Sequence, residues 1–128
     1  MSLKKMGYSD IAVDVIIQGL NLRKMDNPGY FWKSESDCGD VLFLYMQIQN
    51  GVILDASFQY LGCLGLQLAA SVLTELIKNK SIEALSQFSV RDIISYTKAI
   101  PMQKMECVEF AVESFQSFLK NLPQARVH

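Results

Sequence analysis

The sequence predicts a single domain that contains both β-strands and α-helices, and three observations predict it. Two segments rich in β-branched and aromatic residues, 41–48 and 52–60, flank Asn50-Gly51, and Asn-Gly between such segments indicates a hairpin because both residues tolerate positive φ. Several other stretches carry apolar residues at helical spacing. With 128 residues, half of them hydrophobic, the chain is large enough for one core and corresponds to a single domain over 1–128.

The first expected element is a helix from Tyr8 to about Leu22. Its apolar residues recur at helix-compatible intervals, and Ser9 or Asp10 is placed to cap its start. The stretch 26–29, Asp-Asn-Pro-Gly, is a strong turn signal that closes this element.

A short strand is expected over 30–32, and 34–39 has the composition of an exposed, mobile loop. The hairpin follows, and its second strand alternates well enough to predict one covered face and one partly wet face.

The C-terminal half is expected to be helical. A capping-box-like pair, Ser89 and Asp92, marks one helix start, and Pro101 and Pro123 mark helix ends, with a frayed tail after the last. The expected helices are 65–78, a short one opening at 81–83, 89–98 and 106–121.

Charge and cysteine content exclude several classes of protein. The formal net charge is −1 with no Lys/Arg cluster, so nucleic acid is not an expected partner, and the apolar runs are too short for a membrane span. Three cysteines and no secretion signal argue against a disulfide framework and favour a reducing, cytoplasmic location. The single histidine is His128, the last residue, which argues against Cys-His catalysis and His-ligated zinc.

Each of the three cysteines lies at or shortly before the expected start of a helix or strand. Cys63 and Cys107 each stand where a loop becomes a helix, and unpaired N–H groups there favour the thiolate, the form that binds soft metals. Cys38 lies in a polar loop before a strand, and Lys104 adds positive charge near Cys107. No C-x-x-C pair exists, which excludes a zinc ribbon or thioredoxin site. The residues alone leave open that these thiols are buried core filler.

Three acidic residues lie beside the cysteines. Asp37 and Asp40 flank Cys38, and each is either a solvated loop acid or an oxygen donor to a metal. Glu106, directly before Cys107, is either a favourable anion in a first helical turn or a further ligand.

Taken together, these segments resemble the NifU/IscU-type iron–sulfur cluster assembly scaffolds. The resemblance runs from about Tyr8 to Leu119 and depends on three cysteines in matching contexts and order. The segments that carry it are Cys38-Gly39-Asp40 before the hairpin, Asp55-Ala56-Ser57-Phe58 with Gly62-Cys63, the helix ending Thr74 to Ser81, and Ile100 to Cys107.

The resemblance implies an α+β fold, with a small antiparallel sheet of about three strands and four or five helices packed on one face. It implies a carrier rather than an enzyme, which accepts sulfur from a cysteine desulfurase, combines it with iron into a transient [2Fe–2S] cluster and passes the cluster to apo iron–sulfur proteins. Cys38, Cys63 and Cys107 would be the ligands. Asp40 would be the acidic residue whose removal traps the cluster.

The resemblance also leaves an alternative and three departures. One departure is the run 64–68 after Cys63, which is more apolar than the small, polar run that the family has there. A related zinc-bearing type holds Zn²⁺ with the three cysteines and Asp40 and relays persulfide from the desulfurase, stimulating it; the interval between Cys63 and Cys107 lacks the insertion usual in that type. Glu106 stands where the family commonly has His. The segment read by an Hsp70-type chaperone with its J-protein keeps only Pro101 and Lys104 of the usual L-P-P-V-K pattern.

Overall fold

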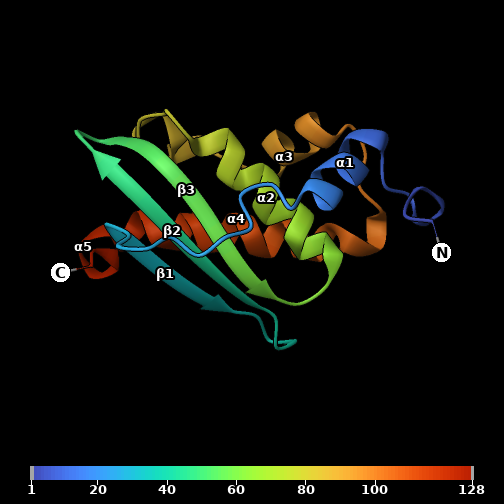
Figure 1. Cartoon of the computed structure of the whole chain (residues 1–128), viewed down its shortest axis with the longest axis horizontal. Helices are drawn as coiled ribbons and strands as arrows, with labels where there is room; N and C mark the ends of the chain where they lie inside the picture. Colours follow the sequence, from blue (N-terminus) through green and yellow to red (C-terminus); the bar gives the residue numbers. More distant parts are fainter. Residues whose placement is uncertain (1, 128) are drawn as a thin grey trace.

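A three-stranded antiparallel sheet with helices on one face forms the molecule, as the computed structural model of residues 2–127 shows (Figure 1). The expected α+β fold is therefore confirmed. The strands, in the spatial order β1-β2-β3, are β1 (Tyr30–Glu35), β2 (Val41–Gln49) and β3 (Val52–Leu61). The helices are α1 (Asp10–Gln18), α2 (Leu64–Ile77), α3 (Val90–Thr97), α4 (Met105–Lys120) and α5 (Leu122–Ala125), with short 3₁₀ turns η1 (Lys4–Met6), η2 (Ala84–Gln87) and η3 (Met102–Lys104).

The β2–β3 hairpin sets the geometry of the site. Asn50 and Gly51 have φ of 53° and 75°, the positive values that the Asn-Gly turn requires. The pairing continues along both strands until Val41 lies opposite Leu61. Because of this register, the chain leaves β3 beside the residues that enter β2, so segment 62–63 runs next to residue 40.

Helix α2 is the centre of the core. It packs against β3, α1 and α4, and most of its residues are buried, which accounts for the apolar run that follows Cys63. Its one buried polar residue near the start, Gln67, accepts a hydrogen bond from the Tyr60 hydroxyl (2.7 Å) and donates one to the carbonyl of Ile16 (3.0 Å). These two bonds join β3, α2 and α1.

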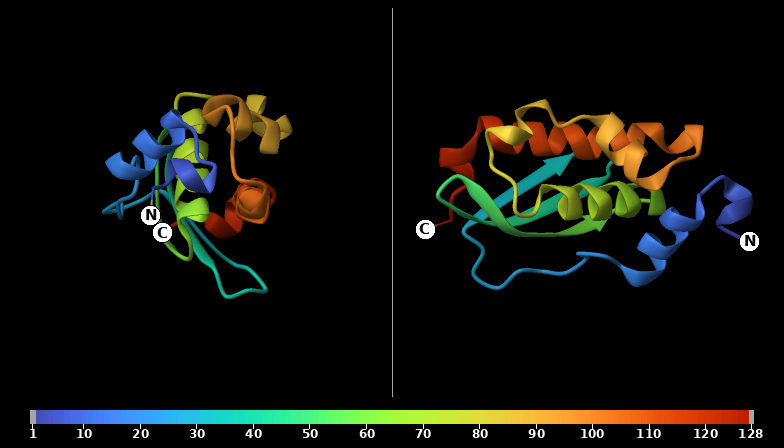
Figure 2. Two further views of the ribbon diagram at one scale, coloured as in Figure 1. Left: turned by 90° about the vertical axis from the view of Figure 1, so that its right-hand side faces the viewer. Right: turned by 90° about the horizontal axis from the view of Figure 1, so that it is seen from above.

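The N-terminal helix is shorter than expected. It ends at Gln18 because Gly19 takes a left-handed conformation (φ 60°) and its N–H bonds the carbonyls of Ile16 and Val15. Leu22, expected inside the helix, instead forms a parallel bridge with Phe58 of β3. The right-hand view of Figure 2 shows residues 19–29 on the side of the sheet opposite α4.

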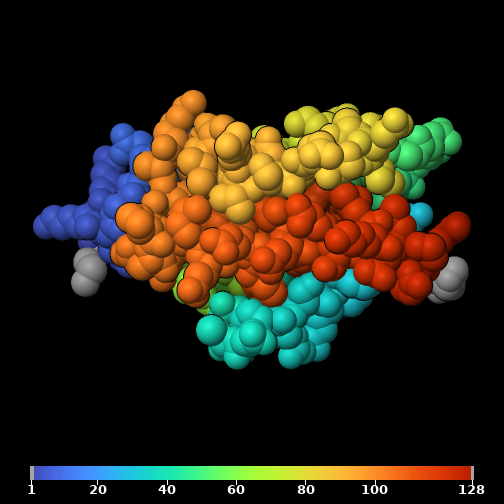
Figure 3. All heavy atoms as spheres, turned by 180° about the vertical axis from the view of Figure 1, so that it is seen from behind, coloured from blue at the N-terminus to red at the C-terminus, as the bar shows by residue number. Residues whose placement is uncertain are grey.

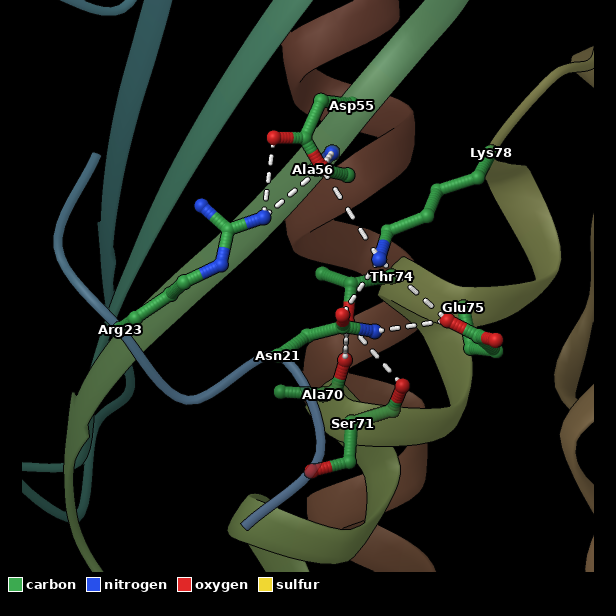
Figure 4. Close-up of polar contacts among 9 residues, drawn as sticks. All are labelled: Asn21, Arg23, Asp55, Ala56, Ala70, Ser71, Thr74, Glu75 and Lys78. Atoms are coloured by element: carbon green, nitrogen blue, oxygen red, sulfur yellow. Dashed lines mark hydrogen bonds and ion pairs between the residues drawn. The ribbon is translucent and has the colours of Figure 1, made fainter. Parts of the chain in front are cut away.

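A polar network holds this returning segment in place (Figure 4). The Arg23 guanidinium bonds both carboxylate oxygens of Asp55 at 2.8 and 2.9 Å. Asn21 donates to Glu75 (3.2 Å) and accepts from Lys78, so the segment is tied to β3 and to the end of α2.

Two further expectations about the ends of elements are wrong. Strand β1 extends to Glu35, so 34–35 are part of the sheet rather than of a loop. Residues 124–127 do not fray: Pro123 lies in the first turn of α5, and beyond that helix Arg126 pairs with Tyr30 while the N–H of Val127 bonds the carbonyl of Gly29 (2.9 Å). The capping box of Ser89 and Asp92 at α3 is present as expected. No helix within residues 2–127 is both long and apolar enough to cross a membrane.

Candidate functional site

Two of the three cysteines meet where α2 and α4 begin. Cys63 is the N-cap residue of α2, and Cys107 lies in the first turn of α4. Because the two helices pack against each other, their starts converge, and the two Sγ atoms lie 3.2 Å apart. Both side chains are partly buried. We refer to Cys63 and Cys107 as the thiol pair.

Asp40 reaches the thiol pair through a close approach to Gly62. A Cβ added at Gly62 would lie 2.9 Å from the Asp40 Oδ1, so only glycine leaves room for the carboxylate where it stands. The turn before β2 holds Asp40 in place, since its N–H donates to the Ser36 hydroxyl (3.0 Å) and its carbonyl accepts from the N–H of Ser36 (2.9 Å). A carboxylate therefore stands next to the residue that precedes Cys63.

Lys104 approaches from the other side, again over a glycine. A Cβ at Gly65, in the first turn of α2, would lie 3.0 Å from the Lys104 Cδ and 3.1 Å from its Cβ. Lys104 immediately precedes α4, and its positive charge lowers the pKa of both Cys63 and Cys107. The pair thus has one cation and one carboxylate as neighbours.

The two thiols differ in acidity although both are partly buried. Burial raises the pKa of Cys63, but the hydrogen bond from Cys107, the amides of Leu66 and Gly65 and the charge of Lys104 together lower that pKa below its ordinary value. No cap hydrogen bond of standard geometry forms at the Cys63 side chain. For Cys107, burial, the hydrogen bond to Cys63 and the negative charges of Cys63 and Asp40 raise the pKa to about 12.

The two thiols share a hydrogen bond and differ in how readily they lose a proton. Because the pKa of Cys63 is lowered and that of Cys107 is raised, Cys63 ionises first and Cys107 keeps its proton to higher pH. Thiolate is the form that ligates soft metals and attacks sulfur. The pair can do both.

Cys38 lies in the exposed turn between β1 and β2 and does not join the pair directly. Within residues 2–127, no group of three or more Cys, His, Asp or Glu side chains is arranged to hold one metal ion. Asp37 beside it is exposed. His128 lies outside the described residues.

Glu106 is exposed and faces the turn across an acidic groove. The groove, of about 440 Å³, runs between that turn and α4, which lie side by side on the face shown in Figure 3. Its carboxylates are Glu35, Asp37, Glu106, Glu109 and Glu113.

Of the two residues expected to bind a chaperone, only Lys104 is partly accessible. Pro101 is buried, and a Cβ at Gly7 would lie 3.3 Å from its Cγ. Met102, directly after Pro101, is 87% exposed.

Sequence reasoning gave no site role to Tyr8, which it placed only at the start of the first helix. The side chain is 3% exposed, and its hydroxyl has no hydrogen-bond partner among residues 2–127. Burial raises the pKa of Tyr8, and charge on Cys63 and on Cys107 raises it further, which places the ring near the thiol pair. Nothing in the sequence signals this, because the contact joins segments far apart in the chain.

Comparisons with known proteins agree on one family. The model described as the NifU-like N terminal domain matches residues 9–127. The chain is 33% identical over 118 residues to the iron–sulfur cluster assembly protein IscU of Plasmodium falciparum, covering 89% of this chain and 72% of that protein. It is 35% identical over 86 residues to the nitrogen fixation protein NifU of Azotobacter chroococcum, covering 66% of this chain but only 28% of that protein.

Two solved structures share the fold. One is a crystal structure from Fervidobacterium islandicum, described as a putative iron–sulfur cluster assembly scaffold protein for the SUF system. It has a TM-score of 0.70 at 21% identity and covers 92% of this chain and 99% of that one. The other is the N-terminal part of a NifU-like protein from Brucella abortus, with a TM-score of 0.72 at 12% identity, covering 96% and 99%.

Proposed function

The chain belongs to the NifU-like N-terminal domain family, and we propose that it is an iron–sulfur cluster assembly scaffold. The names of its relatives support this role, since the similar proteins of Plasmodium and Azotobacter are an iron–sulfur cluster assembly protein and a nitrogen fixation protein NifU. On this proposal the chain is a carrier on which the cluster is built and from which it is passed on.

The observation that carries the proposal is the thiol pair with its two charged neighbours. Two sulfurs 3.2 Å apart at the starts of two packed helices form half of a thiolate-rich site for iron. Asp40 stands beside them as a hard oxygen donor, and Lys104 offsets the negative charge that accumulates when thiolates and sulfide meet.

Cys38 completes the set of ligands by movement of its exposed turn. The turn carries Gly39 with φ 90°, and a Cβ added there would meet no other atom within 4 Å, so nothing packs against this side of the turn. On this proposal the turn that carries Cys38 lies over the thiol pair while the cluster is bound and moves away from the pair when the cluster leaves. An exposed third ligand suits a cluster that is built to be transferred.

The finer steps are those that the family pattern suggests. A cysteine desulfurase donates the sulfur, the product is a [2Fe–2S] cluster, and apo iron–sulfur proteins receive it. An Hsp70-type chaperone would recognise the segment around Lys104, where Met102 is the most exposed apolar side chain. Because Pro101 is buried, it would support the shape of this segment more than contact the chaperone.

Anaerobic reconstitution tests the proposal. Reduced protein is incubated with ferrous iron and sulfide, and a cluster is followed by its visible absorption and circular dichroism. We expect the unmodified chain to hold about one [2Fe–2S] cluster per thiol pair. Cys107→Ser should hold no cluster, and Asp40→Ala should hold its cluster for longer than the unmodified chain. If no cluster forms and the protein instead holds stoichiometric zinc, the scaffold assignment is wrong and the zinc-bearing persulfide relay replaces it.

A further inference from the structure

We propose that the thiol pair also reduces the sulfur delivered to it, releasing sulfide at the place where the cluster is built. This inference rests on the proposed function, because it concerns the persulfide that a scaffold accepts. Sulfur arrives from a donor as sulfane sulfur, whereas the cluster contains sulfide. Something must add electrons, and the two thiols stand in position to do so.

The carrying observation is the distance between the two sulfurs. When Cys63 accepts a sulfane sulfur, its own Sγ becomes the inner sulfur of a persulfide. The Cys107 Sγ lies 3.2 Å from that atom in the structure, within the roughly 3–3.5 Å range in which reacting atoms are ready to combine. The same holds in reverse if Cys107 is the acceptor.

The reaction balances without an added reductant. The Cys107 sulfur attacks the inner sulfur of the Cys63 persulfide anion, forming a Cys63–Cys107 disulfide and breaking the bond to the terminal sulfur. That sulfur departs with the electron pair of the broken bond and takes the thiol proton of Cys107, so it leaves as hydrosulfide. The two cysteines together lose two electrons, and the sulfane sulfur gains them.

The surroundings favour the departure of an anion. The amides of Leu66 and Gly65 face the Cys63 sulfur, and Lys104 lies against the first turn of α2, so negative charge that develops next to this sulfur is stabilised by two amides and a cation. Asp40, on the other side, opposes a resident negative charge. An external dithiol, such as a thioredoxin-type reductant, then restores the pair by thiol–disulfide exchange.

Cys38 takes no part in this step. Its side chain is exposed in the β1–β2 turn and lies outside the pair. The matched control is a change away from all three cysteines, Lys33→Ala on β1, which leaves both reacting sulfurs and their neighbours in place.

The test follows the fate of one sulfane sulfur. Fully reduced protein is loaded anaerobically with glutathione persulfide, desalted and assayed for released sulfide, for remaining persulfide and, by peptide mass mapping, for the Cys63–Cys107 disulfide. The unmodified chain and Lys33→Ala should each release about one sulfide per disulfide formed, with a rate constant independent of protein concentration. Cys63→Ser and Cys107→Ser should keep a persulfide on the remaining cysteine and release sulfide about tenfold more slowly or less.

Circular dichroism shows whether each variant is folded. If either Cys63→Ser or Cys107→Ser does not fold, the other serine variant still tests the inference. A persulfide that persists on Cys63 or Cys107 in the unmodified chain overturns the inference. So does sulfide release that is equal in all variants, or that scales with protein concentration. Cluster formation from iron and free sulfide needs no sulfane sulfur, so its success or failure judges the scaffold proposal separately.

Discussion

Alkylation of the thiol pair measures how Cys63 and Cys107 share one proton. The perturbation is Cys63→Ala, which removes the acceptor of the Cys107 hydrogen bond and the charge that raises the pKa of Cys107. With a pKa of about 12 in place of its ordinary 9.0, Cys107 at pH 8 has a thiolate fraction about a thousandfold smaller. A more basic thiolate is a better nucleophile, by about 16- to 32-fold over three pKa units.

The balance of these two effects makes Cys107 about 30- to 60-fold less reactive than an ordinary cysteine at pH 8. Cys63→Ala recovers only part of this loss, because burial is the largest cause of the raised pKa and Asp40 stays in place. We therefore expect Cys107 to react about five- to tenfold faster in the variant.

The assay is initial-rate labelling with iodoacetamide at pH 8, quenched early and read by peptide mass spectrometry. Early quenching matters because alkylation of Cys63 itself removes the interaction. Cys38→Ala is the control and should leave the Cys107 rate unchanged, since Cys38 is no cause of the shift. An equal Cys107 rate in Cys63→Ala and in the unmodified chain would refute the shared proton.

Three further changes test the neighbours of the pair and the core. Gln67→Leu removes two buried hydrogen bonds that join β3 and α1 to α2; it should cost about 1–2 kcal/mol and lower Tm by about 5 °C, and an unchanged melting curve by circular dichroism contradicts this. Lys104→Met removes the cation that lowers the pKa of Cys63, so Cys63 alkylation at pH 7 should slow about threefold; a faster rate has the wrong sign. Gly62→Ala places a Cβ 2.9 Å from the Asp40 Oδ1 and displaces that carboxylate. Alkylation of Cys107 should therefore become faster, as it should in Asp40→Asn, but by a smaller factor. Opposite effects of the two variants on this rate would contradict the position of Asp40 beside the thiol pair.

Local signals in the sequence account for what could be predicted. The Asn50-Gly51 turn, the Ser89 capping box and the placement of Cys63 and Cys107 at helix starts each depend on a few neighbouring residues. Such local patterns predict structure because a few neighbouring residues are enough to favour a hairpin turn or a helix start. The positions of Cys63 and Cys107 at helix starts could therefore be predicted one residue at a time.

What the sequence could not show depends on packing between distant segments. The 3.2 Å separation of the two sulfurs arises from α2 lying on α4, and the buried hydroxyl of Tyr8 has no local signal at all. The first helix was predicted too long because the apolar residue Leu22 fits both a helix face and a bridge to Phe58. Tertiary pairing decided between the two.

The two irregular segments that flank the sheet also protect it from unwanted association. A free strand edge presents unpaired amides and carbonyls, onto which another chain can add and start aggregation. Here residues 21–23 occupy part of the outer edge of β3, and 126–127 pair with the chain at the beginning of β1. The remainder of β1 carries Lys33 and Glu35, exposed charges of the kind that discourage strand addition. Strand addition along either side of the sheet would therefore have to displace these segments or bring charged side chains together.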